Sequence, residues 1–366
     1  MSDIIRGERN VRGQAVIERI CDGLGIPGPM LGILPRPWEP SGVVASESHF
    51  GSHFADPSRA AGEGSGRLDL VTVAYLRREV EEVSTRYAGE PSIALLPEVG
   101  RHLGTLVNWQ HQTMSYAVRR DLHAATAETS TLMGKLAWDA SARTDNGTAR
   151  KYFRQAADAA RELCDPVAEG SALLRNSFVD LYGEKNPRIA LDALRYTYET
   201  VSGRSSILAG LAILHQAEAH AMLKQQRDCE NCLADAEKCL EVAKEDDPGR
   251  SMASPGQFNR MAGSCFLYLD DACRAEKKLE ATVAEVRSGS KTHAIVLGNL
   301  ALAQLRQGNV DEAIHTVGEA ISVVAGHRGG GGLNLIFRAG RELQAWNTLS
   351  GVRETNDRLF GLIASP

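Results

Sequence analysis

Five segments of this 366-residue chain repeat one pattern: a small residue, a bulky apolar residue four positions later, and a second small residue three positions after that. They lie at intervals of about forty residues, with Ala in the bulky position of the third: Ala149/Phe153/Ala156, Ala190/Leu194/Thr197, Cys232/Ala236/Cys239, Ala275/Leu279/Thr282 and Ala313/Val317/Ala320. Offsets of four and seven fall on one helix face, where small residues let a second helix approach closely. Such hairpins bury their apolar face only by stacking on neighbours. The pattern therefore predicts an all-α fold, an α-solenoid of helical hairpins.

The last repeat also matches a known consensus. Leu300-Ala301, followed by RQGNVDEAI at 306–314, resembles the tetratricopeptide (TPR) repeat, with Gly308 at the turn between its two helices. The other segments are degenerate and longer than the ~34 residues usual for that family. The resemblance implies a TPR-like solenoid over residues 68–366.

Apolar periodicity and breaker residues predict the other helices. Pro91 and Pro97 are expected to interrupt the chain before the second helix, the turn Asp145-Asn146-Gly147 to end the third, and the Gly-rich segment 327–332 to follow the last hairpin. The expected helices outside the hairpins are 70–87, 98–110 and 115–142, then two capping helices at 333–345 and 352–363.

Composition limits the classes of function. The net charge of -5 does not favour a general nucleic-acid binder, so any DNA contact must come from a local surface. The chain has no run of 18 uncharged apolar residues and no apolar signal segment near its start, and its seven Cys fit a reducing compartment. We therefore expect a cytoplasmic protein.

The first residues resemble a second family. The segments MSDIIRGERNV (1–11) and VIERICDGLGIP (16–27) resemble the back half of a Cro/repressor-type (XRE-family) helix-turn-helix domain. With the exit at 35–38, the helix around 76–80, the repeats and the final helix at 352–359, nearly the whole chain resembles actinobacterial regulators that join this domain to TPR repeats. The resemblance implies a transcription regulator with a partial DNA-binding domain at 1–34. The Gly- and Ser-rich composition that follows predicts a flexible linker at 35–67.

The resemblance also implies DNA-contacting residues. Arg9 and Asn10 would reach phosphate oxygens, and Ser2, Asp3 and Arg6 would lie toward the groove. The alternative is that these are solvated side chains of a disrupted domain. Helices one and two and the start of the recognition helix are absent, so we expect a start codon about forty residues upstream, the alternative being a truncated gene product.

Several motifs invite a chemical interpretation. Cys229-x-x-Cys232, near Cys239, Cys265 and Cys273, could bind zinc or sense oxidants, but core packing explains it more simply. The pair His49/His53 lies in the linker, and 288–292 and 329–332 lack the strand that a phosphate loop needs, so we expect both segments to be connectors between helices. We therefore predict no metal, no cofactor and no enzymatic activity.

The most favourable binding surface is the concave side of the solenoid, lined by the first helix of each hairpin. Asn176 and Asn299 occupy equivalent repeat positions, where TPR proteins present Asn to a peptide backbone, and Asn259, Arg260 and His215 lie on other first helices. The alternative is that these are ordinary solvated polar residues. We expect this of His215 in particular, because His215 and His220 are five residues apart and do not share a helix face well.

Together these features predict a regulator whose solenoid receives a peptide, protein or small-molecule signal, can form a homodimer, and controls DNA binding by linkage. The rival hypothesis is a DNA-free scaffold that binds a protein partner.

Overall fold

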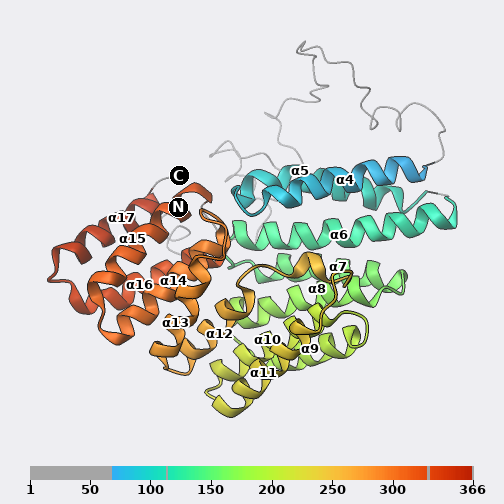
Figure 1. Cartoon of the computed structure of the whole chain (residues 1–366). Helices are drawn as coiled ribbons and strands as arrows, with labels where there is room; N and C mark the ends of the chain where they lie inside the picture. Colours follow the sequence, from blue (N-terminus) through green and yellow to red (C-terminus); the bar gives the residue numbers. More distant parts are fainter. Residues whose placement is uncertain (1–67, 113, 328–329, 365–366) are drawn as a thin grey trace, which may run out of the picture. The chain divides into compact units, whose positions relative to one another are not determined.

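The computed structural model describes residues 68–112, 114–327 and 330–364, all within one compact unit, residues 60–366. The predicted helix-turn-helix segment and linker lie outside the described residues. Every regular element described is helical (Figure 1). The α-helices are α4 (Leu70–Arg86), α5 (Ser92–Trp109), α6 (Tyr116–Ala140), α7 (Asn146–Glu162), α8 (Pro166–Phe178), α9 (Pro187–Val201), α10 (Ser206–Met222), α11 (Gln226–Glu241), α12 (Gln257–Tyr268), α13 (Ala272–Val283), α14 (Lys291–Gln307), α15 (Val310–His327), α16 (Gly330–Leu343) and α17 (Ser350–Ala364). Short helices η2 (Val179–Gly183, a π-helix), η3 (Arg250–Met252) and η4 (Gln344–Trp346) complete the elements.

Polar caps define most helix starts. The cap side chain accepts a hydrogen bond from a backbone N–H two or three residues on, which satisfies a donor that the helix leaves free. These caps are Asp69, Ser115, Asp145, Asp165, Asn186, Ser205, Asp271 and Ser290. Because Asp145 caps α7, the predicted turn Asp145-Asn146-Gly147 is the beginning of a helix.

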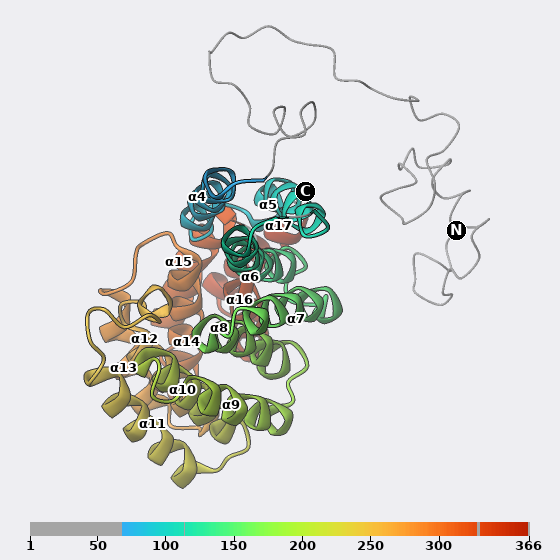
Figure 2. The ribbon, with the colours of Figure 1, turned by 90° about the vertical axis from the view of Figure 1, so that its right-hand side faces the viewer.

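The helices pack as sequential antiparallel pairs, α6 with α7, α8 with α9, α10 with α11, α12 with α13 and α14 with α15. The first helix of each pair also contacts the first helix of the next. Figure 2 shows these pairs following one another from α6 to α15. The arrangement confirms the all-α class and is consistent with a helical repeat.

The predicted repeat segments lie on the second helices, α7, α9, α11, α13 and α15. Phe153 of α7 is 1% exposed and packs on Gly134 of α6, where an added Cβ would lie 2.6 Å from the ring. Leu279 of α13 packs in the same way on Gly263 of α12. Glycine on a first helix thus makes room for the bulky residue of its partner.

The register predicted for the third repeat is wrong by three residues. On α11 the buried residues are Cys229, Leu233 and Ala236, whereas Cys232 and Cys239 are half-buried. The buried set has the same spacing, with Leu in the bulky position. Because Cys occurs at several positions of this segment, the sequence fits two overlapping registers. The register that buries Leu233 is the one adopted, since it removes the larger apolar side chain from water.

Two predicted helix boundaries are also wrong. α5 continues through Pro97, which removes only the hydrogen bond to the carbonyl of Ile93, a 69% exposed residue in the first turn. α16 begins at Gly330 within the expected Gly-rich break. Gly332 belongs to that helix because it packs against α14, where a Cβ would lie 2.6 Å from the Cβ of Ala294.

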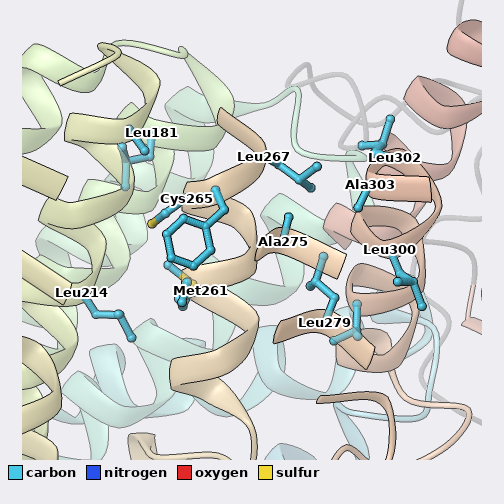
Figure 3. Close-up of a cluster of buried hydrophobic side chains, with 14 of the residues drawn as sticks. Leu181, Leu214, Met261, Cys265, Leu267, Ala275, Leu279, Leu300, Leu302 and Ala303 are labelled. Carbon is cyan, nitrogen blue, oxygen red and sulfur yellow. The ribbon is translucent and has the colours of Figure 1, made fainter. Parts of the chain in front are cut away.

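One continuous apolar core extends from α8 to α17. Figure 3 shows part of it, where Leu181 and Leu214 lie on one side of Met261 and Cys265 of α12, and Leu279 and Leu300 on the other. Full burial of such side chains stabilises the fold by about 1.5–3 kcal/mol each. No described helix is both long and apolar enough to cross a membrane.

Candidate functional site: the inner ring of helices

The first helices of the pairs, together with α16, form a closed ring. Each of α6, α8, α10, α12 and α14 contacts the next, and α16 contacts both α14 and α6. At the closure the backbone N–H of Lys291 donates to the carbonyl of Ala88 (3.2 Å), and Asn334 Nδ2 donates to the carbonyl of Ala142 (3.1 Å). We call α6, α8, α10, α12, α14 and α16 the inner ring.

Asp139 of α6 is the centre of a polar network at this closure. Its carboxylate accepts a hydrogen bond from the Tyr87 hydroxyl and lies 3.3 Å from Arg143 Nε and 3.8 Å from Lys291 Nζ. Lys291 Nζ also donates to Ser92 Oγ at 2.7 Å. Burial and the neighbouring carboxylate raise the pKa of Tyr87, so its hydroxyl stays a donor. Asp139 thus joins α4, α6 and α14.

A second network surrounds Glu218 of α10. Its carboxylate accepts hydrogen bonds from Tyr182 and, at 2.7 Å, from Ser264 Oγ of α12, and lies 3.7 Å from His215 Nδ1. Tyr182 lies in η2, the π-helical turn that extends α8, an irregularity common at functional sites. Burial raises the pKa of Glu218, but the nearby His215 and the hydrogen bonds from Tyr182 and Ser264 outweigh it, so the net shift is downward. Its carboxylate therefore stays charged and accepts a hydrogen bond on each oxygen.

Three cationic side chains of the inner ring, Lys135 (α6), Arg175 (α8) and Arg260 (α12), have no carboxylate within ion-pair distance in the described part of the chain. We call them the cation cluster. Arg175 Nη2 donates to the sulfur of Met252 (3.5 Å) and its guanidinium lies 5.4 Å from the centre of the Phe178 ring, while Lys135 Nζ lies 4.2 Å from the centre of the Tyr87 ring. The Nε atoms of Arg175 and Arg260 are buried without an acceptor in the described residues.

Electrostatics links the three cations. Burial, followed by repulsion from Arg175, lowers the pKa of Lys135 to about 7. Burial also lowers the pKa of Arg175 and of Arg260. The nearby carboxylate of Asp139 opposes this shift for Arg175 and that of Glu218 opposes it for Arg260, while Arg143 repels both. All three side chains nevertheless keep some accessible surface. Partly accessible yet poorly hydrated cations are typical of a binding surface rather than of a core.

The predicted groove residues fall into two groups. His215 and Arg260 lie in this charged surface, and Asn176 adjoins Arg175 with its buried Oδ1 lacking a donor among the described residues. Asn259 instead accepts a hydrogen bond from Lys278 of α13 at 3.1 Å, outside the inner networks, and Asn299 is buried within α14. His215 is 4% exposed, so the expectation of a helix-surface residue is wrong.

The DNA-contacting residues predicted at Ser2, Asp3, Arg6, Arg9 and Asn10, and the pair His49/His53, lie outside the described residues.

The cysteines of the described residues are free thiols. The described residues contain no group of three His, Cys, Asp or Glu side chains arranged to hold a metal ion. Cys229 and Cys265 are buried in the core and adjacent, and hydrogen bonding between them together with burial raises the pKa of Cys265. A thiol of this kind is a poor nucleophile.

A cleft lies elsewhere, at α6 and α7. It has a volume of about 580 Å³ and is lined by Gln110, His123, Lys151 and Arg154, among others. Arg150, which also lines it, is held by Asp180 (2.7 Å) and Glu184 (2.8 Å). Its charges are mixed and partly paired, which favours the inner ring as the candidate site.

Sequence reasoning missed Lys135, Asp139, Arg175 and Glu218. A usable signal was a single charged residue within an otherwise apolar stretch, as for Lys135 in LMGKLAW. Lys291 was also missed, because 288–292 was expected to be only a connector. Residues 288–290 do form a connector, but Lys291 is the first residue of α14 and is only 7% exposed.

Comparison with models of protein families and with curated proteins gave no match for this chain.

Proposed function

We propose that this protein is a transcription regulator whose TPR-like array binds a ligand on the inner ring and controls a helix-turn-helix module. One observation carries the ligand-binding part: the inner ring contains a cluster of cationic side chains whose buried Nε donors have no acceptor in the described residues. Buried polar groups of a folded protein nearly always have partners, so an exception calls for a ligand, a solvent molecule or a mechanism.

The TPR-like assignment has independent support. Gly308, at the turn where the consensus has Gly, takes the left-handed backbone (φ 82°) and ends α14. Ala313, Val317 and Ala320 of the following helix are fully buried, as the consensus requires. The DNA-binding part of the proposal rests on the resemblance of residues 1–34.

The functional coupling follows from the ring. A ligand that bridges the inner helices prefers one spacing of α6, α8 and α12, and any segment tethered to this unit responds to that preference. The ligand and the operator are then linked reciprocally, each changing the affinity for the other by the same factor.

The experiment is chromatin immunoprecipitation of the protein expressed from its own locus, followed by electrophoretic mobility shift on the enriched fragments. The proposal predicts discrete enriched sites and a salt-dependent shift, weakened by Arg9→Ala but not by Arg195→Gln on the exposed face of α9. Absence of any enriched site, with a protein partner co-purifying instead, would favour a DNA-free interaction protein.

A further inference from the structure

The inner ring carries an excess of positive charge. In the two networks and the cation cluster, five Lys and Arg side chains face two carboxylates, those of Asp139 and Glu218, which already accept hydrogen bonds from tyrosine and serine hydroxyls. The charge that remains is that of Lys135, Arg175 and Arg260. In a poorly hydrated environment such repulsion costs free energy unless an anion compensates it.

The free hydrogen-bonding atoms define what kind of anion fits. A guanidinium presents its Nε–H and one Nη–H side by side, a fork that matches two oxygens of a carboxylate or phosphate. Arg175 and Arg260 each have a buried Nε without an acceptor in the described residues. The Oδ1 of Asn176, the residue that follows Arg175 on α8, is also buried without a donor among the described residues, and it can accept a hydrogen bond from an N–H or O–H group.

We propose that Lys135, Arg175 and Arg260 bind an oxyanion, a carboxylate or phosphate group of the ligand, and that Asn176 accepts a hydrogen bond from a donor beside it. This inference rests on the proposed function, since it names the chemical class of the ligand that the inner ring takes. A short peptide with its terminal carboxylate and adjacent amide, or a phosphorylated metabolite with a hydroxyl, satisfies the same set of atoms.

The test is isothermal titration calorimetry of the full chain with citrate and with pyrophosphate at constant ionic strength, sodium chloride serving as the blank. We expect saturable binding of at least one probe, and a preference between them reports whether the site suits carboxylate or phosphate. Arg175→Gln and Arg260→Gln each weaken binding tenfold or more, because each leaves one anion oxygen without its charged donor. Arg195→Gln, which removes an equal charge from the exposed face of α9, changes the affinity less than twofold.

Folding is checked in the same samples by thermal melting. Since Arg175 has no carboxylate partner in the described chain, Arg175→Gln is expected to melt no lower than the parent, and Arg175→Lys to recover part of the affinity. Binding of neither probe, or equal affinity in the parent and the Arg175→Gln/Arg260→Gln double variant, would refute the proposal. The titration contains no DNA, so its failure leaves the regulator hypothesis intact, and absence of operator sites leaves anion binding intact.

Discussion

Lys135→Met offers the sharpest perturbation of the inner ring. Burial lowers the pKa of this ammonium to about 7 from an ordinary 10.5, so the unfolded chain binds more protons than the folded one between these values. Stability must therefore rise with pH across that window, and the rise must vanish when the amine is removed. Below pH 7 Lys135 is mostly charged in the folded protein, so most of the free-energy cost of burying its charge is present there.

The magnitude follows from the two pKa values. Between pH 7.0 and 8.5 the linkage relation gives a gain of about 1.6 kcal/mol, which we reduce to about 1 kcal/mol because the side chain keeps some contact with solvent. The raised pKa values of buried Cys act in the opposite direction toward the upper end of this window, but they act equally in the parent and in Lys135→Met, so the difference between the two proteins reports Lys135 alone.

The assay is urea unfolding at pH 7.0 and 8.5 of the parent, Lys135→Met and Lys277→Met, an exposed lysine of α13 that serves as the matched control. The parent and the control should gain about 1 kcal/mol over Lys135→Met between the two pH values. An identical pH dependence in all three proteins would show that Lys135 is well hydrated, which would refute the electrostatic reasoning.

Three further outcomes are expected. Gly134→Ala should lower the free energy of unfolding by about 1–3 kcal/mol in urea titrations because its Cβ would meet an aromatic ring at 2.6 Å, while Gly104→Ala, with open space around it, should be neutral or stabilising. Asp139→Asn leaves two cations at the ring closure without their carboxylate, so it should destabilise by about 3–5 kcal/mol and speed amide exchange in α16; unchanged exchange there would contradict the closure. Iodoacetamide at pH 8 should modify exposed Cys273 at least tenfold faster than buried Cys265, as followed by peptide mass spectrometry, and equal rates would count against the burial described.

The fold class was predictable because packing repeats along the chain. Phe153 and Leu279 stand at fixed offsets from small residues, and the same offsets decide which helix face is buried. Two local exceptions were not predictable. Pro97 is tolerated in α5 because the first turn of that helix is exposed, and Gly332 is helical because α14, which is distant in sequence, packs against it.

The candidate site was only partly predictable. Arg260 and Asn176 could be placed on first helices by repeat position alone. Lys135 and Lys291 meet near Tyr87 only because the array closes on itself, and no local pattern encodes that closure. Whether the Nε atoms of Arg175 and Arg260 have an acceptor depends on how the carboxylates of the packed molecule are oriented, which the sequence does not show.

The most direct test of anion binding by the inner ring is the number of protons exchanged on binding. At pH 7.0 Lys135 is about half protonated, and a bound oxyanion must raise its pKa, so the complex takes up a proton. Calorimetry in two buffers of different ionisation enthalpy should show that the parent takes up more protons per bound citrate or pyrophosphate than Lys135→Met does, because proton exchange of the probe itself is common to both proteins. Equal proton exchange in the two proteins would contradict the assignment of the site.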